Sequence, residues 1–260
     1  MPSQRGDFSP ALSHGAGEMV DDILTMMWKE RRTLFRNRAS RSRLLMLLLT
    51  PVMLSTVIPY NWGPEWVEEF PSLIIAVVVP ALLVAVMIPD SFAGERERHT
   101  LPTLLSSRLP DRAILLGKMI TPVAVGWGAA LLFALLSLVV VNVAHGEGQF
   151  LFYTPPIALG ILALSFLAAT IMAGAGVLTS LRAATMQEAS QKLMLLIIVP
   201  AVVVQVVPLL FRAQLTRWLR EVEVNGAQLL AIIVVVLAVI DAGLLAAAMI
   251  RFQRARMYLD

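Results

Sequence analysis

Most of the side chains in this sequence that could do chemistry lie in one charged stretch. The run "DSFAGERERHTLPTLLSSRLPDRAILLGK" covers residues 90–118, and long apolar runs flank it on both sides. Two outcomes are open for its carboxylates, Glu95 and Glu97. They can form ion pairs with the neighbouring arginines and with Lys118, bracing the stretch against nearby helices, or they can remain solvated charges of little energetic weight.

Catalytic and metal-binding chemistry is poorly represented. The chain has no cysteine, which excludes disulfides and thiolate metal sites. Its three histidines, His14, His99 and His145, lie in separate polar segments and cannot by themselves form a zinc cluster. Asp241 is the only carboxylate well inside an apolar run, and no G-x-S-x-G motif occurs. An enzyme is therefore the least favoured class of protein for this sequence.

The composition indicates an integral membrane protein. Hydrophobic residues make up 58% and charged residues 15% of the 260 positions, whereas soluble domains carry about 25% charged residues. The mean hydropathy is +0.76. The net charge of +3 does not indicate nucleic acid, because the basic residues gather at the borders of apolar runs, as at a membrane surface. The sequence therefore predicts an all-α membrane protein that binds the lipid bilayer and no nucleic acid.

Six apolar runs are long enough to cross a hydrocarbon core of roughly 30 Å as helices. The expected spans are Leu44–Tyr60, Leu73–Ile88, Met119–Ala144, Pro156–Leu181, Leu193–Leu210 and Leu229–Ile250. Glycines at four positions in these spans would let helices approach each other closely. They are Gly126, Gly128, Gly174 and Gly176.

The distribution of basic residues predicts the orientation. With both termini in the cytoplasm, 18 of the 21 Lys and Arg residues lie on the cytoplasmic side, which is a strong positive-inside bias. The three outside are Arg212, Arg217 and Arg220. The expected organisation is a disordered cytoplasmic tail over residues 1–18, an amphipathic interfacial helix over 19–43, a six-span transmembrane domain over 44–250 and a cytoplasmic tail over 251–260.

Two segments have the pattern of amphipathic helices. In the first, the apolar face consists of Val20, Ile23, Leu24, Met27, Trp28, Leu34 and Phe35, and the opposite face of Asp21, Asp22, Lys29, Glu30, Arg32 and Arg36. Such a helix tends to lie in the plane of the membrane interface, and packing on a soluble partner is the alternative. In the second, residues 211–226, the apolar face consists of Phe211, Leu215, Trp218, Leu219 and Val222. With Asn225 and Gly226 as a stop signal, it predicts a short helix on the outer surface.

The charged stretch contains the signals of two helices. Thr100 can cap the first, and Asp111 can cap the second, which runs into the third span. The first helix has an apolar ridge made of Leu101, Leu104 and Leu105. A ridge on the cytoplasmic face has no core of its own, so it needs cover from the base of the bundle or from a separate protein.

This stretch resembles the signature of ABC transporter permeases of the type-two exporter class, which carry an "ERE-x-x-T-L-x-x-L-L…P…GK"-like segment between their second and third spans. The matching residues are Glu95, Arg96, Glu97, Thr100, Leu101, Leu104, Leu105, Pro110, Gly117 and Lys118. Two positions depart from the family pattern, with His99 in place of glycine and Pro102 in place of glutamate. The resemblance extends to the layout of entry helix, six spans and outer helix, over residues 19–256.

The resemblance implies a function. In this family the loop is a coupling element pressed into a cleft on a separate ATP-hydrolysing subunit, so its matching residues here would be coupling residues. The chain would be the permease subunit of an ABC exporter in the cell membrane, not an enzyme, working as a homodimer or heterodimer. ATP and Mg²⁺ would bind to the partner ATPase. The sequence has no G-x-x-x-x-G-K-[ST] motif, since Met119 follows Lys118 and Arg112 stands where the first glycine belongs.

Asp241 and three other polar residues are candidates for lining a translocation path. Asp241 lies 12 residues from the outer end of its span, about 18 Å deep, where insertion scales put the cost of a charge at about 2.5–3.5 kcal/mol. By the same rise per residue, Ser165 lies about 14 Å, Thr170 about 21 Å and Gln205 about 8 Å from the outside.

Two interpretations of Asp241 are open. Its carboxyl can be protonated and hydrogen-bonded to a hydroxyl or carbonyl group of a neighbouring helix. Alternatively, it can lie on the wall of the path and attract cationic or polar groups of a substrate. The same aspartate is the support for an alternative function, an ion-coupled transporter or channel that works without ATP.

Overall fold

The computed structural model describes residues 16–36, 38–97, 110–211 and 225–252. The side chains of residues 33–47 and of residues 204, 205 and 207–209 lie outside the described set. Throughout the described residues the regular structure is helical. The helices are α1 (Ala16–Arg36), α2 (Arg38–Trp62), α3 (Glu65–Glu68), α4 (Pro71–Glu97), α6 (Asp111–His145), α7 (Pro155–Ser180), α8 (Met186–Leu210) and α10 (Gly226–Arg251).

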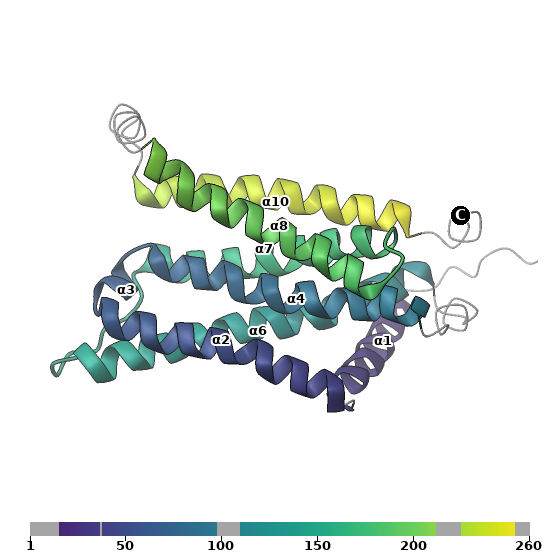
Figure 1. Cartoon of the computed structure of the whole chain (residues 1–260), viewed down its shortest axis with the longest axis horizontal. Coiled ribbons are helices and arrows are strands. Elements are labelled where there is room, and N and C mark those ends of the chain that lie inside the picture. Colours follow the sequence, from purple (N-terminus) through teal and green to yellow (C-terminus); the bar gives the residue numbers. More distant parts are fainter. Residues whose placement is uncertain (1–15, 37, 98–109, 212–224, 253–260) are drawn as a thin grey trace, which may run out of the picture.

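The long helices run alongside one another in an elongated bundle, and α1 lies across one end of it (Figure 1). We call this end the α1 end, and the opposite end, where α3 lies, the α3 end. Five of the described helices are long and apolar enough to cross a membrane, namely α4, α6, α7, α8 and α10. The chain is thus a multi-pass membrane protein.

Several parts of the expected layout lie partly or wholly outside the described residues. The first expected span, Leu44–Tyr60, falls within α2, but the side chains in the first part of this helix are not described, so the count of six spans stays a prediction. The expected outer helix at 211–226 is described only at its ends. Most of the two expected tails lies outside the described residues as well.

Helix α4 forms the centre of the bundle, because it packs against more of the long helices than α10 does. Inside the chain, 67% of its span is buried, against 11% of the span of α10. Helix α4 packs against α6, α7 and α8, whereas α10 packs mainly against α7. The inward positions of α10 recur every three or four residues, at Leu230, Val234, Leu237, Asp241, Leu245 and Ala248. We call this narrow contact the α7–α10 seam.

Three of the four glycines expected to allow close helix contact do so. A Cβ on Gly176 would lie 2.6 Å from Ile88 Cγ2 of α4, so a larger residue would force α4 and α7 apart. Gly126 and Gly174 are in similarly close contact with α4 and α10. The expectation for Gly128 is wrong, because nothing lies within 4 Å of the position of its Cβ.

The charged stretch is more helical than the sequence suggested. Helix α4 continues past the expected second span to Glu97, and α6 begins at Asp111, so the connection between them is residues 98–110. The end of an apolar run marks the membrane border, which need not be the end of the helix. The N-cap position of α6 is Pro110, and Asp111 lies in the first turn. The expected short helix with Thr100, Leu101, Leu104 and Leu105 lies outside the described residues.

Asn225 starts a helix, whereas the sequence pattern of Asn225 and Gly226 predicted the stop of the preceding one. The Asn225 Oδ1 atom accepts a hydrogen bond from the backbone N–H of Ala227 at 3.4 Å. Gln228 Oε1 accepts one from the backbone N–H of Asn225 at 3.2 Å. Together they satisfy N–H groups that the first turn of α10 leaves without partners.

Candidate functional site

A buried ionic cluster joins α1, α4 and α6 at the α1 end. Its centre is Lys118, whose side chain is fully buried. The Lys118 Nζ atom lies 3.1 Å from Glu30 Oε1 and 2.9 Å from Glu95 Oε2. It also donates a 2.6 Å hydrogen bond to the backbone carbonyl of Ser91. The ammonium group thus donates hydrogen bonds to Glu30 and to the Ser91 carbonyl and forms a second ion pair with Glu95.

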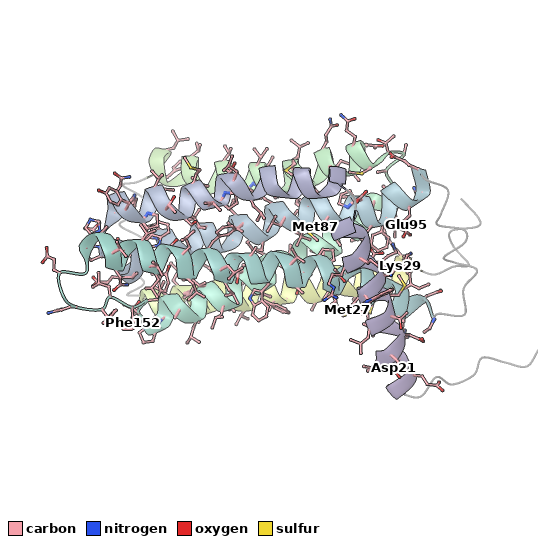
Figure 2. All side chains as sticks on the ribbon, turned by 90° about the horizontal axis from the view of Figure 1, so that it is seen from below. Asp21, Met27, Lys29, Met87, Glu95 and Phe152 are labelled. Atoms are coloured by element: carbon pink, nitrogen blue, oxygen red, sulfur yellow. The ribbon has the colours of Figure 1, made fainter. Side chains whose placement is uncertain are left out.

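Two further contacts extend this cluster. Lys29 Nζ lies 3.2 Å from Glu95 Oε1, and the two side chains meet where α1 crosses the bundle (Figure 2). The Ser91 hydroxyl donates a 3.2 Å hydrogen bond to Glu30 Oε2. Two carboxylates therefore face two ammonium groups, which satisfies the requirement that buried charges be paired. We call Lys29, Glu30, Ser91, Glu95 and Lys118 the Lys118 cluster.

The packing of α1 on α6 places Glu30 in the cluster. A Cβ on Gly117 would overlap Met26, so glycine at this position lets α1 approach α6 closely. Met26 and Glu30, one helical turn apart, are only 1% and 5% exposed. Glu30, expected on the polar face of α1, therefore meets Lys118 of α6 and not solvent. The exposed apolar side of α1 contains Val20, Leu24 and Trp28, and its place at a membrane interface stays a prediction.

Arg96 and Glu97 join the end of α4 to the connection between α7 and α8. The Arg96 guanidinium donates to the backbone carbonyls of Ala183 at 3.0 Å and of Leu181 at 3.3 Å. Glu97 Oε1 accepts a 2.6 Å hydrogen bond from the backbone N–H of Met186 at the start of α8. Helix ends leave such backbone groups without partners, so these two side chains complete the end of α7 and the beginning of α8.

The structure brings together only some of the predicted coupling residues. Glu95 pairs with Lys118, which is one of the two outcomes that the sequence left open, whereas the described contact of Glu97 is with backbone. The remaining residues of that set, Thr100, Leu101, Leu104 and Leu105, lie outside the described residues. Sequence reasoning missed Lys29, Glu30 and Ser91 as members of the cluster. Their only signal is the position of Glu30 one turn after Met26, which becomes informative once α1 is known to pack on α6.

A second polar site lies in the α7–α10 seam. Thr170 Oγ1 lies 2.8 Å from Asp241 Oδ2, and Asp241 is only 7% exposed. Ser165 is also buried, but its hydroxyl bonds to the Ile161 carbonyl of its own helix. The side chain of Gln205 lies outside the described set. Among the hydroxyl groups expected near the depth of Asp241, Thr170 is thus the one in contact with it.

These features define a class of protein, a multi-pass membrane protein whose helices are joined at one end by buried charges. No group of three or more His, Asp or Glu among the described residues could hold a metal ion. The chain belongs to the ABC-2 family of transporter proteins, since the model described as "ABC-2 family transporter protein" matches residues 8–221. This match includes the whole Lys118 cluster. No curated protein matches the sequence. Members of this family are membrane components of transporters.

Proposed function

We propose that this chain is the membrane-spanning permease subunit of an ATP-driven exporter in the cell membrane. Its family supports the transport role. The basic residues concentrated toward the α1 end support a cytoplasmic location of that end and of both termini. A second permease chain, identical or related, would complete the translocation path, and two separate ABC ATPase subunits would hold ATP and Mg²⁺ beneath it.

The observation that most directly supports the proposal is that both sides of the 98–110 segment are attached to several helices. On one side, Glu95 pairs with residues of α1 and α6, and Glu97 binds the start of α8. On the other side, Lys118 pairs with Glu30 of α1. A displacement of this segment is therefore passed to four helices together. That is the property that a coupling element requires.

In the proposed cycle, the two ATPase subunits close on each other when they bind ATP and Mg²⁺. The apolar ridge of Leu101, Leu104 and Leu105 follows the ATPase surface that covers it. The Lys118 cluster then moves α1, α4 and α6 as one unit, and the path changes the side to which it is open. Asp241, Thr170, Ser165 and Gln205 are the proposed path residues.

A photo-crosslinking experiment tests the partner. A photoreactive amino acid at Leu104, introduced in the native host, should crosslink to a protein with an ABC ATPase sequence, identified by mass spectrometry. The control position is Val143, which is 83% exposed near the α3 end of α6 and should give no such product. If no ABC ATPase is found at Leu104, or if it is found equally at Val143, the proposed coupling role is wrong.

The second candidate function is an ion-coupled transporter or channel that needs no ATP. The buried contact between Asp241 and Thr170 favours it, because intramembrane carboxyl groups mark ion and proton pathways. The two functions differ in what the chain does alone. Purified protein in sealed vesicles without an ATPase should give no gradient-driven ion or proton flux if it is an exporter subunit. A flux that Asp241→Asn abolishes would favour the second function.

A further inference from the structure

The α7–α10 seam contains one ionisable group, Asp241, which has a single polar contact among the described residues. Thr170 Oγ1 lies 2.8 Å from Asp241 Oδ2. The other carboxyl oxygen, Asp241 Oδ1, is buried and has no hydrogen-bond partner in the described part of the chain. With 7% exposure, Asp241 is more than nine-tenths buried, so the groups around it decide whether its carboxyl group is charged.

Both residues lie at the same depth. Thr170 is 15 residues from the start and 10 from the end of α7, and Asp241 is 15 residues from the start and 10 from the end of α10. Both helices start at the α3 end, so the contact lies about 22 Å from that end and about 15 Å from the other. This places the carboxyl group in the middle of the bundle, away from both polar borders.

No basic side chain among those that the structure describes lies at this depth. Helix α7 contains no titratable residue, and the only other one in α10 is Arg251, about 15 Å away along the helix. In α8, Glu188 and Lys192 pair with each other at 2.6 Å near the α1 end. The titratable residues of α4 and α6 all lie within the eight residues at one end or the other of these helices, near the ends of the bundle. An ionised Asp241 would therefore lie in the seam without a countercharge, which is costly.

A proton on Oδ2 of Asp241 would make this oxygen a hydrogen-bond donor to Thr170 and would remove the buried charge. The hydroxyl group of Thr170 has one hydrogen, and within its own helix it can donate it to the carbonyl of Phe166 or of Leu167, each at 3.1 Å. Thr170 Oγ1 is then free to accept a hydrogen bond from the protonated Oδ2 of Asp241. The remaining Oδ1 becomes a neutral carbonyl oxygen, which is much less costly to bury than a charged one.

We propose that Asp241 and Thr170 form a proton-binding site in the middle of the α7–α10 seam, occupied when α10 is packed on α7. Release of this proton would leave a carboxylate that needs water, so it accompanies separation of the two helices. The packed arrangement therefore binds one proton more than the separated one, and raising the pH favours separation. Only 11% of the α10 span is buried, against 67% of that of α4, so separating α10 from the bundle uncovers less buried surface than separating α4 would. This inference does not depend on the ATPase partner.

Infrared spectroscopy of the full chain in lipid nanodiscs tests the proposal. The difference between wild type and Asp241→Asn at neutral pH should contain the carbonyl stretch of a protonated carboxylic acid. Thr170→Val keeps the shape of the side chain but removes the hydroxyl, and should shift this band to the higher frequency of a carbonyl whose acid group is no longer hydrogen-bonded. The matched control Ser165→Ala removes a buried hydroxyl that bonds within its own helix and should leave the band unchanged.

Carbon-13 labelling of the aspartates keeps the test decisive if Asp241→Asn does not fold. The Thr170→Val difference spectrum then identifies Asp241 in otherwise unchanged protein, because the responding band must carry the isotope shift. Carboxylate bands in place of the acid band at neutral pH, or a carboxylic acid band that ignores Thr170→Val, would overturn the proposal. Neither result would bear on the exporter function, since the readout is independent of transport.

Discussion

Replacing Lys118 with methionine should destabilise the protein more than any other single loss of charge among the described residues. The substitution keeps most of the side-chain volume but removes the ammonium group that lies within 3.1 Å of both Glu30 and Glu95. Glu95 retains Lys29, whereas Glu30 retains the hydroxyl of Ser91 and loses its ion pair. Removing one partner of a buried pair costs about 3–5 kcal/mol, because the other charge is left uncompensated.

The chain offers a matched control in Lys192→Met. The Lys192–Glu188 pair has a shorter N–O distance, 2.6 Å, but its side chains are 49% and 40% exposed. Exposed pairs contribute little to stability, because water screens them, so burial and not distance decides the magnitude. For a chain of this size, each kcal/mol changes the melting temperature by roughly 2–4 °C. Lys118→Met should therefore melt at least about 6 °C below wild type, and Lys192→Met much closer to it.

A double variant separates lost pairing from lost packing. Lys118→Met with Glu30→Gln removes both members of one pair and leaves Glu95 with Lys29. The melting temperature, followed by intrinsic fluorescence in detergent or nanodiscs, should be higher than the sum of the two single losses predicts, since contacting residues are not additive. If Lys118→Met and Lys192→Met melt at the same temperature, the buried cluster does not stabilise the protein and the argument fails.

Three further changes test other parts of the chain. Replacing Leu104 and Leu105 with aspartates should abolish stimulation of the partner ATPase while membrane insertion is unchanged, and unchanged stimulation would contradict docking of this ridge. Gly117→Ala should lower the free energy of unfolding by about 1–3 kcal/mol through its clash with α1, whereas Gly128→Ala, in open space, should not lower it. Burial raises the pKa of Tyr153 to about 12, so the free energy of unfolding should fall as the pH rises from about 10 through this value. In an absorbance titration of the tyrosines, Tyr153→Phe should remove the component that titrates at the highest pH. An unchanged titration would contradict this.

The long helices could be predicted because their apolar runs are long enough to cross the hydrocarbon core of a membrane. The ends of the helices are harder to predict. The expected second span ends at Ile88, but the polar residues after it continue the same helix to Glu97. The pairing of Glu30 was missed for a different reason. A helical face drawn for α1 alone does not show which neighbouring helix its charges meet, and only the contact with α6 shows that Lys118 neutralises this one.

The candidate sites follow the same division. The Glu95–Lys118 pair could be predicted because both residues border the same loop. The fixed rise of a helix limits the possible partners of Asp241 to hydroxyl groups at a similar depth. Which of these it contacts depends on which helices are neighbours, and that could not be predicted. No sequence pattern indicates the hydrogen bonds of Arg96 to backbone carbonyls.

The loose attachment of α10 has a consequence for biosynthesis. Helices α4, α6 and α7, which bury one another, all precede α10 in the chain, and each leaves the ribosome before α10 is made. The bundle can therefore assemble first and receive α10 as a late addition along one side. Thr170 is then already inside the membrane when Asp241 is inserted. The residue of α10 with the highest free-energy cost of insertion therefore has its hydrogen-bond partner in place from the start.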